Sequence, residues 1–372
     1  LLRTTPAAGA IGSCRYKLKD GNLEDFERIL EVMRAHDAGY FFYIGGNDSM
    51  DTADRVSRLA QSEGYGLVVT GVPKTIDNDL GDDKFTIIDH TPGYGSAARY
   101  WAYLLQSVEE ENRGMSGSEP VAVLQAMGRK SGYIPAAARL GDPDRRMPLQ
   151  IYTAEAGHNL DSLLDNVRMQ IGKSGRCIVV LSEGFDVGGL GEKHDAFGHI
   201  EYGASGSTVA QVVTNYLNEK GVYAKVAGTV PAAGQGNVTG QVPGIIQRST
   251  SIHASTVDQD EAFAVGRKAV EIAVSEGTGF MATILRKSWE RYEPVYDKVL
   301  LRTVANSVRQ LPAQWLDKSG TDVTDDFIRY AMPLIGAGWP QVPLEKGLQR
   351  FARLKRVFVE KKCSPYVPVN FR

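Results

Sequence analysis

The sequence predicts an α/β fold, built from doubly wound parallel sheets with helices on both faces. Short apolar runs alternate with longer segments of helical periodicity along the chain up to Leu217. The runs are rich in Val and Ile, which is typical of strands buried in parallel sheets. Strands that alternate with helices in this way are joined by right-handed βαβ crossovers. No fixed-period repeat is present, so the pattern disfavours a solenoid or a propeller.

The first part of the chain predicts two helix and strand pairs. Apolar positions between 23 and 33 recur at helical spacing, and the apolar run at 40–44 that follows ends at two glycines. This order predicts a helix, a strand and a glycine turn. A second helical pattern covers 51–61, and the β-branched run at 66–72 predicts the next strand.

The alternation continues through the middle of the chain. The further expected helices are 96–110, 160–171 and 207–217, and the further expected strands are 120–126 and 176–181. The segment 232–242 is glycine-rich and polar, which predicts a mobile loop. Basic residues recur between 350 and 362, and we interpret them as a solvated helix face in preference to an anion site.

Composition and charge exclude several classes of protein. The chain has 372 residues, which is enough for about two to three domains with a sizeable core. No apolar run approaches the roughly 20 residues of a membrane span, so we expect no membrane partner. A net charge of -2 gives no long-range attraction to nucleic acid, and we expect none as a partner. An anionic substrate must therefore be held by individual Lys and Arg side chains.

The cysteines and the start of the chain bear on its cellular context. Cys14, Cys177 and Cys363 are far apart and form no C-x-x-C pair, so neither a zinc site nor a disulfide framework is indicated. We expect a reducing, cytoplasmic location. The chain opens with Leu1 and not with Met, so we expect an upstream segment that was removed or is not recorded.

The first chemical motif is Gly45-Gly46-Asn47-Asp48-Ser49, where a predicted strand ends and a helix begins. Ligands of open α/β sheets bind at the carboxyl ends of strands, and glycines there let backbone N–H groups approach phosphate oxygens. The alternative is a tight strand-to-helix turn in which Asp48 or Ser49 caps the helix.

The second motif is the segment Pro73–Asp79, directly after the next predicted strand. It places the carboxylates of Asp77 and Asp79, the hydroxyl of Thr75 and the ammonium of Lys74 in one loop. These groups can deprotonate an alcohol beside a phosphate. An Asx-rich turn is the structural alternative.

Both motifs resemble those of the phosphofructokinase superfamily, and the chain is most similar to its pyrophosphate-dependent 6-phosphofructokinases. The motif at 45–49 is similar to the donor-site GGDG or GGDD of that family, and the segment Pro73–Asp79 is similar to its catalytic loop. Further matches follow in the family's order along nearly the whole chain: Gly12-Ser13-Cys14-Arg15, Met127-Gly128-Arg129, Ser182-Glu183-Gly184 and Pro243-Gly244-Ile245-Ile246-Gln247-Arg248. The ordered series is more specific than any single motif.

The resemblance implies two Rossmann-like domains, each of three αβα layers, that face one cleft. The donor domain would comprise 1–92 and about 250–300. The sugar-phosphate domain would comprise 93–249 and about 301–372, with a C-terminal helical extension. In the family a first strand and a glycine-rich loop precede the equivalent of Leu1, so we expect both to be absent here. The family also implies a homodimer or a homotetramer.

The activity that the resemblance implies is transfer of a phosphoryl group to the 1-hydroxyl of fructose 6-phosphate, a step of glycolysis. Asp77 would be the general base, Thr75 would contact the transferring phosphate, and Asp79 would support the loop, the substrate or the metal. Lys74 and Arg15 would supply positive charge to the phosphates, which is what this reaction mainly needs. The residues expected to cradle the sugar phosphate are Met127, Gly128, Arg129, Glu183 and Arg248.

Two positions favour pyrophosphate over ATP as the donor, because ATP-dependent relatives carry glycine at both. The carboxylate of Asp48 fills space and repels the additional phosphate of a nucleotide, and the ammonium of Lys74 compensates the charge of a compact diphosphate. The donor would be bound by Gly45, Gly46, Asn47, Asp48 and Ser49. We expect Mg²⁺ as cofactor, held mainly by the diphosphate, with Asn47 as the protein ligand. His90, in a stretch that also resembles the pyrophosphate-dependent branch, is interpreted as structural.

Several positions depart from the family pattern and leave two alternatives open. Asn47 stands where many members carry Asp, and Ile245 stands where many offer His or Tyr. Family members usually carry two arginines that bind the sugar 6-phosphate, and here Pro120 and the loop around Thr239 occupy those places. The alternatives are therefore a non-catalytic or regulatory subunit, and a kinase for another sugar phosphate.

Overall fold

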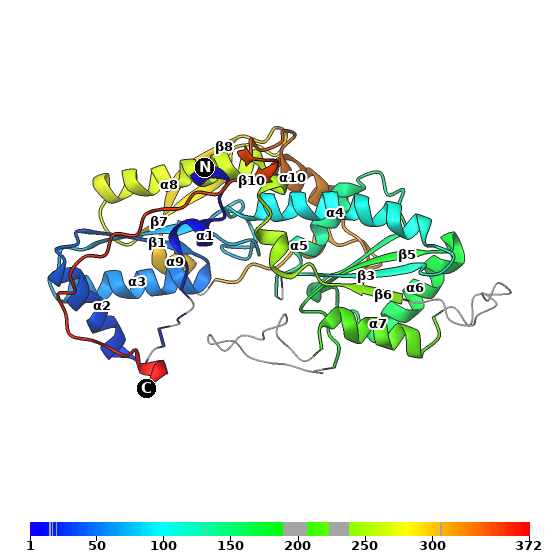
Figure 1. Cartoon of the computed structure of the whole chain (residues 1–372), viewed down its shortest axis with the longest axis horizontal. Helices are drawn as coiled ribbons and strands as arrows, with labels where there is room; N and C mark the ends of the chain where they lie inside the picture. Colours follow the sequence, from blue (N-terminus) through cyan, green and yellow to red (C-terminus); the bar gives the residue numbers. More distant parts are fainter. Residues whose placement is uncertain are drawn as a thin grey trace.

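Two four-stranded sheets, each with helices on both faces, form the body of the molecule (Figure 1). The computed structural model describes residues 1–14, 16, 18–19, 21–129, 131–188, 207–222, 238–305 and 307–372. The predicted α/β class is confirmed. Each expected strand and helix up to Leu217 is present, with ends that shift by a few residues at most.

The first sheet has the strand order β1-β2-β7-β8. Its strands are β1 (Tyr40–Gly45), β2 (Val68–Pro73), β7 (Phe280–Arg286) and β8 (Pro294–Leu300). The first three strands are parallel, and β8 runs antiparallel to β7. Helices cover both faces: α2 (Leu23–Ala35) and α3 (Asn47–Ser62) lie on one side, and α8 (Thr256–Ser275) lies on the other.

The second sheet is entirely parallel and has the order β4-β5-β3-β6. Its strands are β3 (Val121–Ala126), β4 (Leu149–Tyr152), β5 (Cys177–Ser182) and β6 (Val238–Gln241). One face is covered by α4 (Tyr94–Gly114), α5 (Tyr133–Ala136) and α10 (Asp325–Ile335). The other face is covered by α6 (Leu160–Ser174) and α7 (Val209–Glu219).

Separate apolar cores lie on the two faces of each sheet, because every strand except the edges is buried on both sides. Val123 and Val179 point to the α6 and α7 face, whereas Leu124 and Val180 point to the α4 face. This two-sided burial explains why the strands have continuous apolar runs without polar alternation.

Shorter elements connect these layers. They are η1 (Leu2–Thr4), α1 (Ala7–Ile11), η2 (Ala137–Gly141), η3 (Ala154–Ala156), η4 (Gly244–Arg248), η5 (Ser251–His253), α9 (Leu301–Val304), η6 (Ala313–Trp315), β9 (Leu344–Glu345), β10 (Leu348–Gln349) and η7 (Val369–Phe371). No helix in the described part of the chain has the length and apolarity that crossing a membrane requires.

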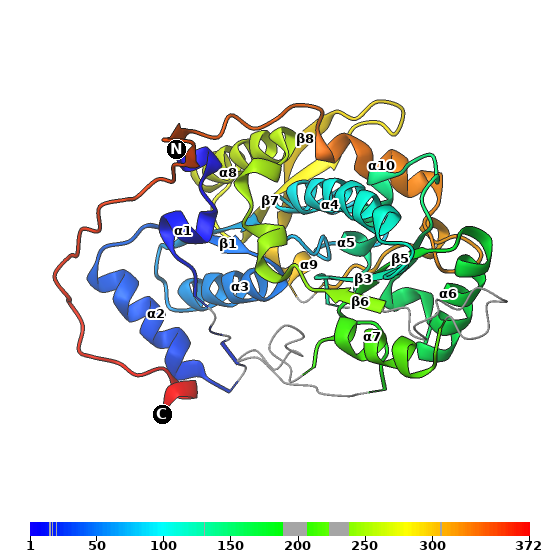
Figure 2. The ribbon, with the colours of Figure 1, turned by 45° about the vertical axis from the view of Figure 1, so that its right-hand side comes forward.

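The C-terminal tail differs from the expected helical extension. After α10 the chain contains no α-helix, and the basic run 350–362 is extended. The tail runs along the edge of the first-sheet half and ends on α2, as both views show (Figures 1 and 2). There Tyr366 and the amide of Val369 donate to one oxygen of Asp25, at 2.6 and 3.1 Å. Val357, Phe358 and Val359 in this run are residue types that favour extended backbone over helix.

The glycine-rich segment 232–242 also differs in part from its prediction. Residues 232–237 lie outside the described residues, whereas Val238–Gln241 form β6 and pair in parallel with β3. This edge strand was missed because only Val238 is buried, so three of its four residues carry no apolar signal.

Candidate active site

The donor motif is the junction between β1 and α3. Gly45 ends the strand, Gly46 is the N-cap residue, and the helix begins at Asn47. A Cβ on Gly45 would fall 2.0 Å from the hydroxyl oxygen of Ser49, so only glycine fits there. Asp48 lies in the first turn, and the amides of Ser49 and Met50 both donate to the carbonyl of Gly46 at 3.0 Å. The sequence therefore places a helix N-terminus at the carboxyl edge of the sheet.

The predicted catalytic loop lies directly beside this junction. The β1–β2 pairing places Gly45 opposite Pro73, and the amide of Lys74 donates to the carbonyl of Gly45 at 2.9 Å. A Cβ on Gly46 would lie 3.6 Å from Cβ of Thr75. The two motifs, which the sequence separates by a helix and a strand, thus form one surface.

The conformation of the loop is set by local hydrogen bonds. The hydroxyl of Thr75 accepts from the amide of Asp77 at 3.1 Å, which closes a short turn. Asn78 follows with φ of 58°, in the left-handed region where Asn is tolerated better than most residues. Asp77 and Asp79 therefore flank a residue whose backbone conformation must be held in place by its surroundings.

A second pair of loops faces the first from the other sheet. Gly128 and Arg129 follow β3 with φ of 123° and 53°. One carboxylate oxygen of Glu183, at the end of β5, accepts from the amides of both, at 3.1 and 2.8 Å. The hydroxyl of Ser182 donates to the carbonyl of Arg129 at 2.9 Å. Glu183 therefore shapes the Met127–Arg129 turn, a structural task that its sequence context does not indicate.

Two contacts tie the acceptor-side elements together. The hydroxyl of Ser131 donates to the carbonyl of Asp77 at 3.4 Å, which joins the β3 loop to the catalytic loop. The side-chain oxygen of Gln247 accepts from the amide of Met127 at 3.1 Å and from the indole of Trp101 at 2.9 Å. Because Gln247 precedes Arg248 in η4, this anchor places η4 beside the β3 loop.

The charges of the site converge on Asp77. Burial raises the pKa of its carboxyl, and the positive charges of Arg129, Arg248 and Lys74 oppose that rise. Arg129 and Arg248 come from the second-sheet half and Lys74 from the first-sheet half. Predicted site residues from both halves of the fold thus act electrostatically on one carboxylate.

Two more carboxyl groups share this environment. Burial raises the pKa of Asp79 to about 7, with a further contribution from the charge of Asp77. Burial likewise raises the pKa of Glu183 to about 7, again reinforced by Asp77. Three neighbouring carboxyl groups disfavour one another's ionisation, and such groups are typical of sites that carry out proton transfer.

The position expected to hold a metal has one oxygen available. The amide nitrogen of Asn47 donates to the carbonyl of Ser307, whereas its Oδ1 is buried and makes no hydrogen bond. Within the described residues no group of three or more His, Cys, Asp or Glu side chains forms a metal cluster. A metal bound here would therefore take most of its ligands from elsewhere. Arg15, the remaining predicted site residue, lies outside the described residues.

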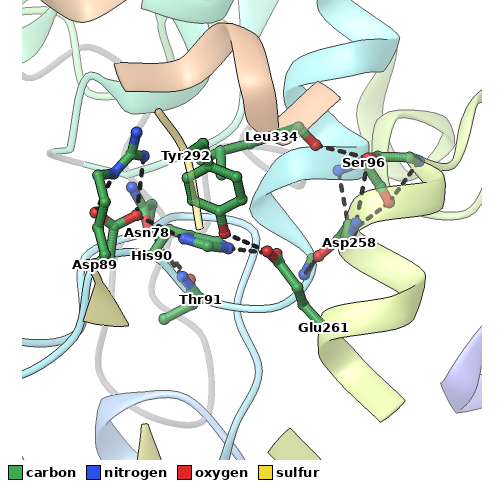
Figure 3. A network of polar contacts seen from close by, with 12 residues as sticks. Asn78, Asp89, His90, Thr91, Ser96, Asp258, Glu261, Tyr292 and Leu334 are labelled. Atoms are coloured by element: carbon green, nitrogen blue, oxygen red, sulfur yellow. Dashed lines mark hydrogen bonds and ion pairs between the residues drawn. The ribbon is translucent and has the colours of Figure 1, made fainter. Parts of the chain in front are cut away.

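His90 belongs to a buried network behind the loop (Figure 3). Its two ring nitrogens contact Asp89 at 2.8 Å and Glu261 of α8 at 2.7 Å, and Tyr292 donates to the other oxygen of Glu261. Burial alone would lower the pKa of His90, but the two carboxylates outweigh it and raise the pKa to about 9. His90 is 1% exposed, which agrees with a structural interpretation.

Sequence reasoning missed the residues that support the loop from behind. Arg309 donates to the backbone carbonyl and to the side-chain oxygen of Asn78. The side-chain nitrogen of Asn78 donates to the hydroxyl of Tyr330 at 2.8 Å. The amide of Thr91 donates to the same Asn78 oxygen at 3.1 Å. Asn78 was part of the quoted motif, but nothing in the sequence near Arg309 indicates its contact.

Comparison with known proteins places this arrangement among related ones. The phosphofructokinase family model matches residues 4–273. A pyrophosphate–fructose 6-phosphate 1-phosphotransferase of Halomonas elongata is 37% identical over 98% of this chain and 84% of its own length. The crystal structure of a pyrophosphate-dependent phosphofructokinase from Nitrosospira multiformis is 36% identical, with a TM-score of 0.82 over 98% of this chain and 83% of that one. The corresponding structure from Marinobacter aquaeolei is 35% identical, with a TM-score of 0.78 over 96% and 81%.

Proposed function

Because this chain belongs to the phosphofructokinase family, we propose that it transfers a phosphoryl group from pyrophosphate to the 1-hydroxyl of fructose 6-phosphate. The products are fructose 1,6-bisphosphate and phosphate. The relatives named for this reaction match nearly the whole chain, which supports both the enzyme class and the donor. The observation that carries the proposal is the half-buried Asp77 carboxylate, on which cations from both halves of the fold act.

Asp77 is the general base of the proposed mechanism. Its carboxylate accepts the proton of the sugar 1-hydroxyl as the oxygen attacks the terminal phosphorus of pyrophosphate, and the bond to the leaving phosphate breaks. Burial raises the pKa of this carboxyl, and the positive charges of Arg129, Arg248 and Lys74 favour its ionised form. The same three cations also offset the charge of the phosphate oxygens, which is the main requirement of the reaction.

The other predicted residues are proposed to bind and orient the two substrates. Thr75 and Asp79 flank the base, and Arg15 would add charge to the transferring group. The sugar phosphate would lie against the Met127–Arg129 turn, Glu183 and Arg248. The first turn of α3 and the two glycines around its start would bind the pyrophosphate.

A divalent cation, which we propose is Mg²⁺, is compatible with the donor site. The unpartnered Oδ1 of Asn47 is a hard oxygen ligand of the kind that Mg²⁺ accepts. Because no group of three or more His, Cys, Asp or Glu side chains among the described residues is arranged to hold a metal ion, the diphosphate itself would supply most of the coordination. The bound ion would neutralise charge on the diphosphate, while the cations of the chain act on Asp77 and its surroundings.

The choice of pyrophosphate over ATP can be tested with a matched variant. A coupled assay with fructose 6-phosphate should show turnover with pyrophosphate and none with ATP. Replacing Asp48 and Lys74 together by glycine should lower kcat/KM for pyrophosphate by about 10- to 100-fold, because the ammonium that compensates the charge of the diphosphate is lost. The relative rate with ATP should rise at the same time.

The outcomes of these assays separate the alternatives. Turnover with ATP alone would overturn the donor assignment. An inactive full-length protein that still binds phosphate would indicate a non-catalytic subunit. Faster turnover of another sugar phosphate in a substrate panel would identify that compound as the acceptor in place of fructose 6-phosphate. The exposed Ile245 at the acceptor side is the position that motivates the panel.

The remaining assignments follow from the same family membership. We propose a donor domain of 1–92 with about 250–300, and an acceptor domain of 93–249 with about 301–372, because the strands of the two sheets divide along these segments. The tail of the acceptor domain would then cross to the donor domain, where it ends on α2. We also propose a homodimer or homotetramer in the cytoplasm, to be tested by the mass of the particle in solution and by fractionation.

A further inference from the structure

The chain between α9 and η6 carries no recognised motif, yet it contacts the donor motif, the catalytic loop and residues beside the acceptor turn. Ser307 accepts from Asn47 through its carbonyl and from the amide of Gly81 through its hydroxyl, the latter at 3.1 Å. Two residues later Arg309 meets the catalytic loop, with its amide 2.6 Å from the carbonyl of Asp79. The donor motif and the catalytic loop are thus fastened to one short segment, 307–311.

The same segment continues into the acceptor side. The carbonyl of Gln310 accepts from the hydroxyl of Tyr133 at 3.0 Å. The amide of Leu311 donates to Glu155 at 2.9 Å, and the same carboxylate oxygen accepts from the amide of Gly132 at 2.8 Å. Residues 131–133 follow the Met127–Arg129 turn, so Ser307, Arg309, Gln310 and Leu311 together link the donor motif and the catalytic loop to the acceptor side.

Arg309 makes the most specific of these contacts. Its side chain is 0% exposed and lies between the rings of Phe85 and Tyr133, with the guanidinium carbon 4.4 and 5.4 Å from their centroids. Nε and Nη2 donate to the carbonyl of Asn78 at 3.1 and 2.9 Å, and Nη2 also reaches the Asn78 Oδ1 at 3.0 Å. Nη1 donates to the carbonyl of Ile88 at 2.7 Å.

A buried guanidinium whose described side-chain bonds all go to amide oxygens gains no stability from a paired carboxylate. Burying a charge in this way is costly, and stability alone does not explain it. The planar guanidinium instead fixes Asn78, whose backbone has a left-handed conformation and which lies between Asp77 and Asp79. The positive charge also opposes the rise of the Asp79 pKa.

We propose that Arg309 is a positioning residue for phosphoryl transfer, which clamps the catalytic loop in register with the donor and acceptor loops through Asn78. The inference rests on the proposed function, since it assigns Asp77 the role of base. Arg309 is fully buried and acts through the loop that it holds. Small errors in the placement of reacting groups lower kcat strongly, even when binding is kept.

The test compares two replacements of Arg309 with one of Arg139. Arg309→Gln should lower kcat about 100-fold, with KM for both substrates changed less than about threefold, because only the orientation of the base Asp77 is lost. The acid limb of kcat/KM should move to higher pH, since the cation near Asp79 is removed. Arg309→Lys keeps the charge but not the planar fork, so it should leave the limb in place and still lower kcat about 10-fold.

Arg139→Gln is the matched control. Arg139 is also a buried arginine, 1% exposed, but its ion pairs go to Asp142 and Asp322, remote from the loop. Its variant should lose stability while retaining kcat per folded molecule and the acid limb of the wild type. Wild-type kcat and pH profile in Arg309→Gln, or the same changes in Arg139→Gln, would overturn the proposal.

The test also covers a variant that fails to fold. If Arg309→Gln does not fold, Arg309→Lys takes its place, because it keeps the buried charge but not the fork that binds both oxygens of Asn78, and wild-type kcat in that variant would equally overturn the proposal. All variants are assayed with the phosphoryl donor that the wild type uses. A wild type that does not use pyrophosphate would therefore contradict the proposed function without affecting the test of Arg309. Amide exchange in the segment 75–81 should accelerate in Arg309→Gln and not in Arg139→Gln, even without turnover, and unchanged exchange would contradict the clamp.

Discussion

Raising the pH should weaken the fold through one residue, His90. The ring is 1% exposed, and it contacts Asp89 and Glu261 at 2.8 and 2.7 Å. Despite burial, these carboxylates raise the pKa of His90 to about 9 from an ordinary value of 6.5. A group whose pKa is higher in the folded state stabilises the fold below its unfolded pKa, and that stabilisation is lost as the pH rises through the folded pKa.

The size of the effect follows from the two pKa values. A rise from 6.5 to about 9 corresponds to about 3 kcal/mol of unfolding free energy. Urea unfolding, followed by circular dichroism between about pH 6 and pH 10, measures this quantity. The matched variant is His90→Gln, which keeps hydrogen-bonding capacity but cannot titrate. The stability advantage of the wild type over this variant should shrink by about 3 kcal/mol across the range, most steeply between about pH 6.5 and 9.

Every other titrating group is present in both proteins, so the difference between the two curves isolates the imidazole. Parallel curves would refute the reasoning, because they would mean that His90 does not hold its proton more tightly in the folded chain. A gap that widens with pH would refute it too, since the sign of the linkage would be reversed.

Three other predictions concern the site. Asp77→Asn should lower kcat by about 100- to 10,000-fold with little change in KM, and a variant with wild-type kcat would remove Asp77 as base. Because the pKa values of Asp79 and Glu183 are raised to about 7, kcat/KM should fall as the pH decreases through about 7, and a profile that stays flat well below that value would contradict the carboxyl cluster. Gly45→Ala should destabilise the fold by about 1 to 3 kcal/mol in thermal unfolding, because its Cβ would lie 2.0 Å from a hydroxyl oxygen; Gly39→Ala, with nothing within 4 Å, is the control and should change stability by less than about 1 kcal/mol.

The strands and the first two motifs were predictable because local sequence determines them. A β-branched run such as Val68–Pro73 is buried on both faces wherever it occurs in a parallel sheet, and the loop after it must open at the carboxyl edge. Asp77 and Lys74 could therefore be placed near a ligand from sequence alone. The expectation that Arg129 and Arg248 bind the sugar phosphate came from the family resemblance, and their effect on Asp77 emerged only from the structure, since their loops belong to another sheet.

What the sequence did not predict depends on contacts between distant positions. Arg309 lies 231 positions beyond Asn78, and no periodicity links an arginine to a carbonyl so far away. The strand β6 was missed because its polar residues occupy a sheet edge, where alternation and burial are weak signals. The extended tail was missed because it is held by Asp25 on α2, a partner more than 340 positions earlier.

The interleaved order of the two sheets has a consequence for synthesis on the ribosome. All four strands of the second sheet lie between residues 121 and 241, whereas the first sheet receives β7 and β8 only from 280–300. Nascent domains fold as units once their segments have emerged, so the second sheet should form first although β1 and β2 are made earlier. Until β7 arrives, the free edge of β2 can pair with other chains. This waiting period is the stage at which a growing chain would depend most on chaperones.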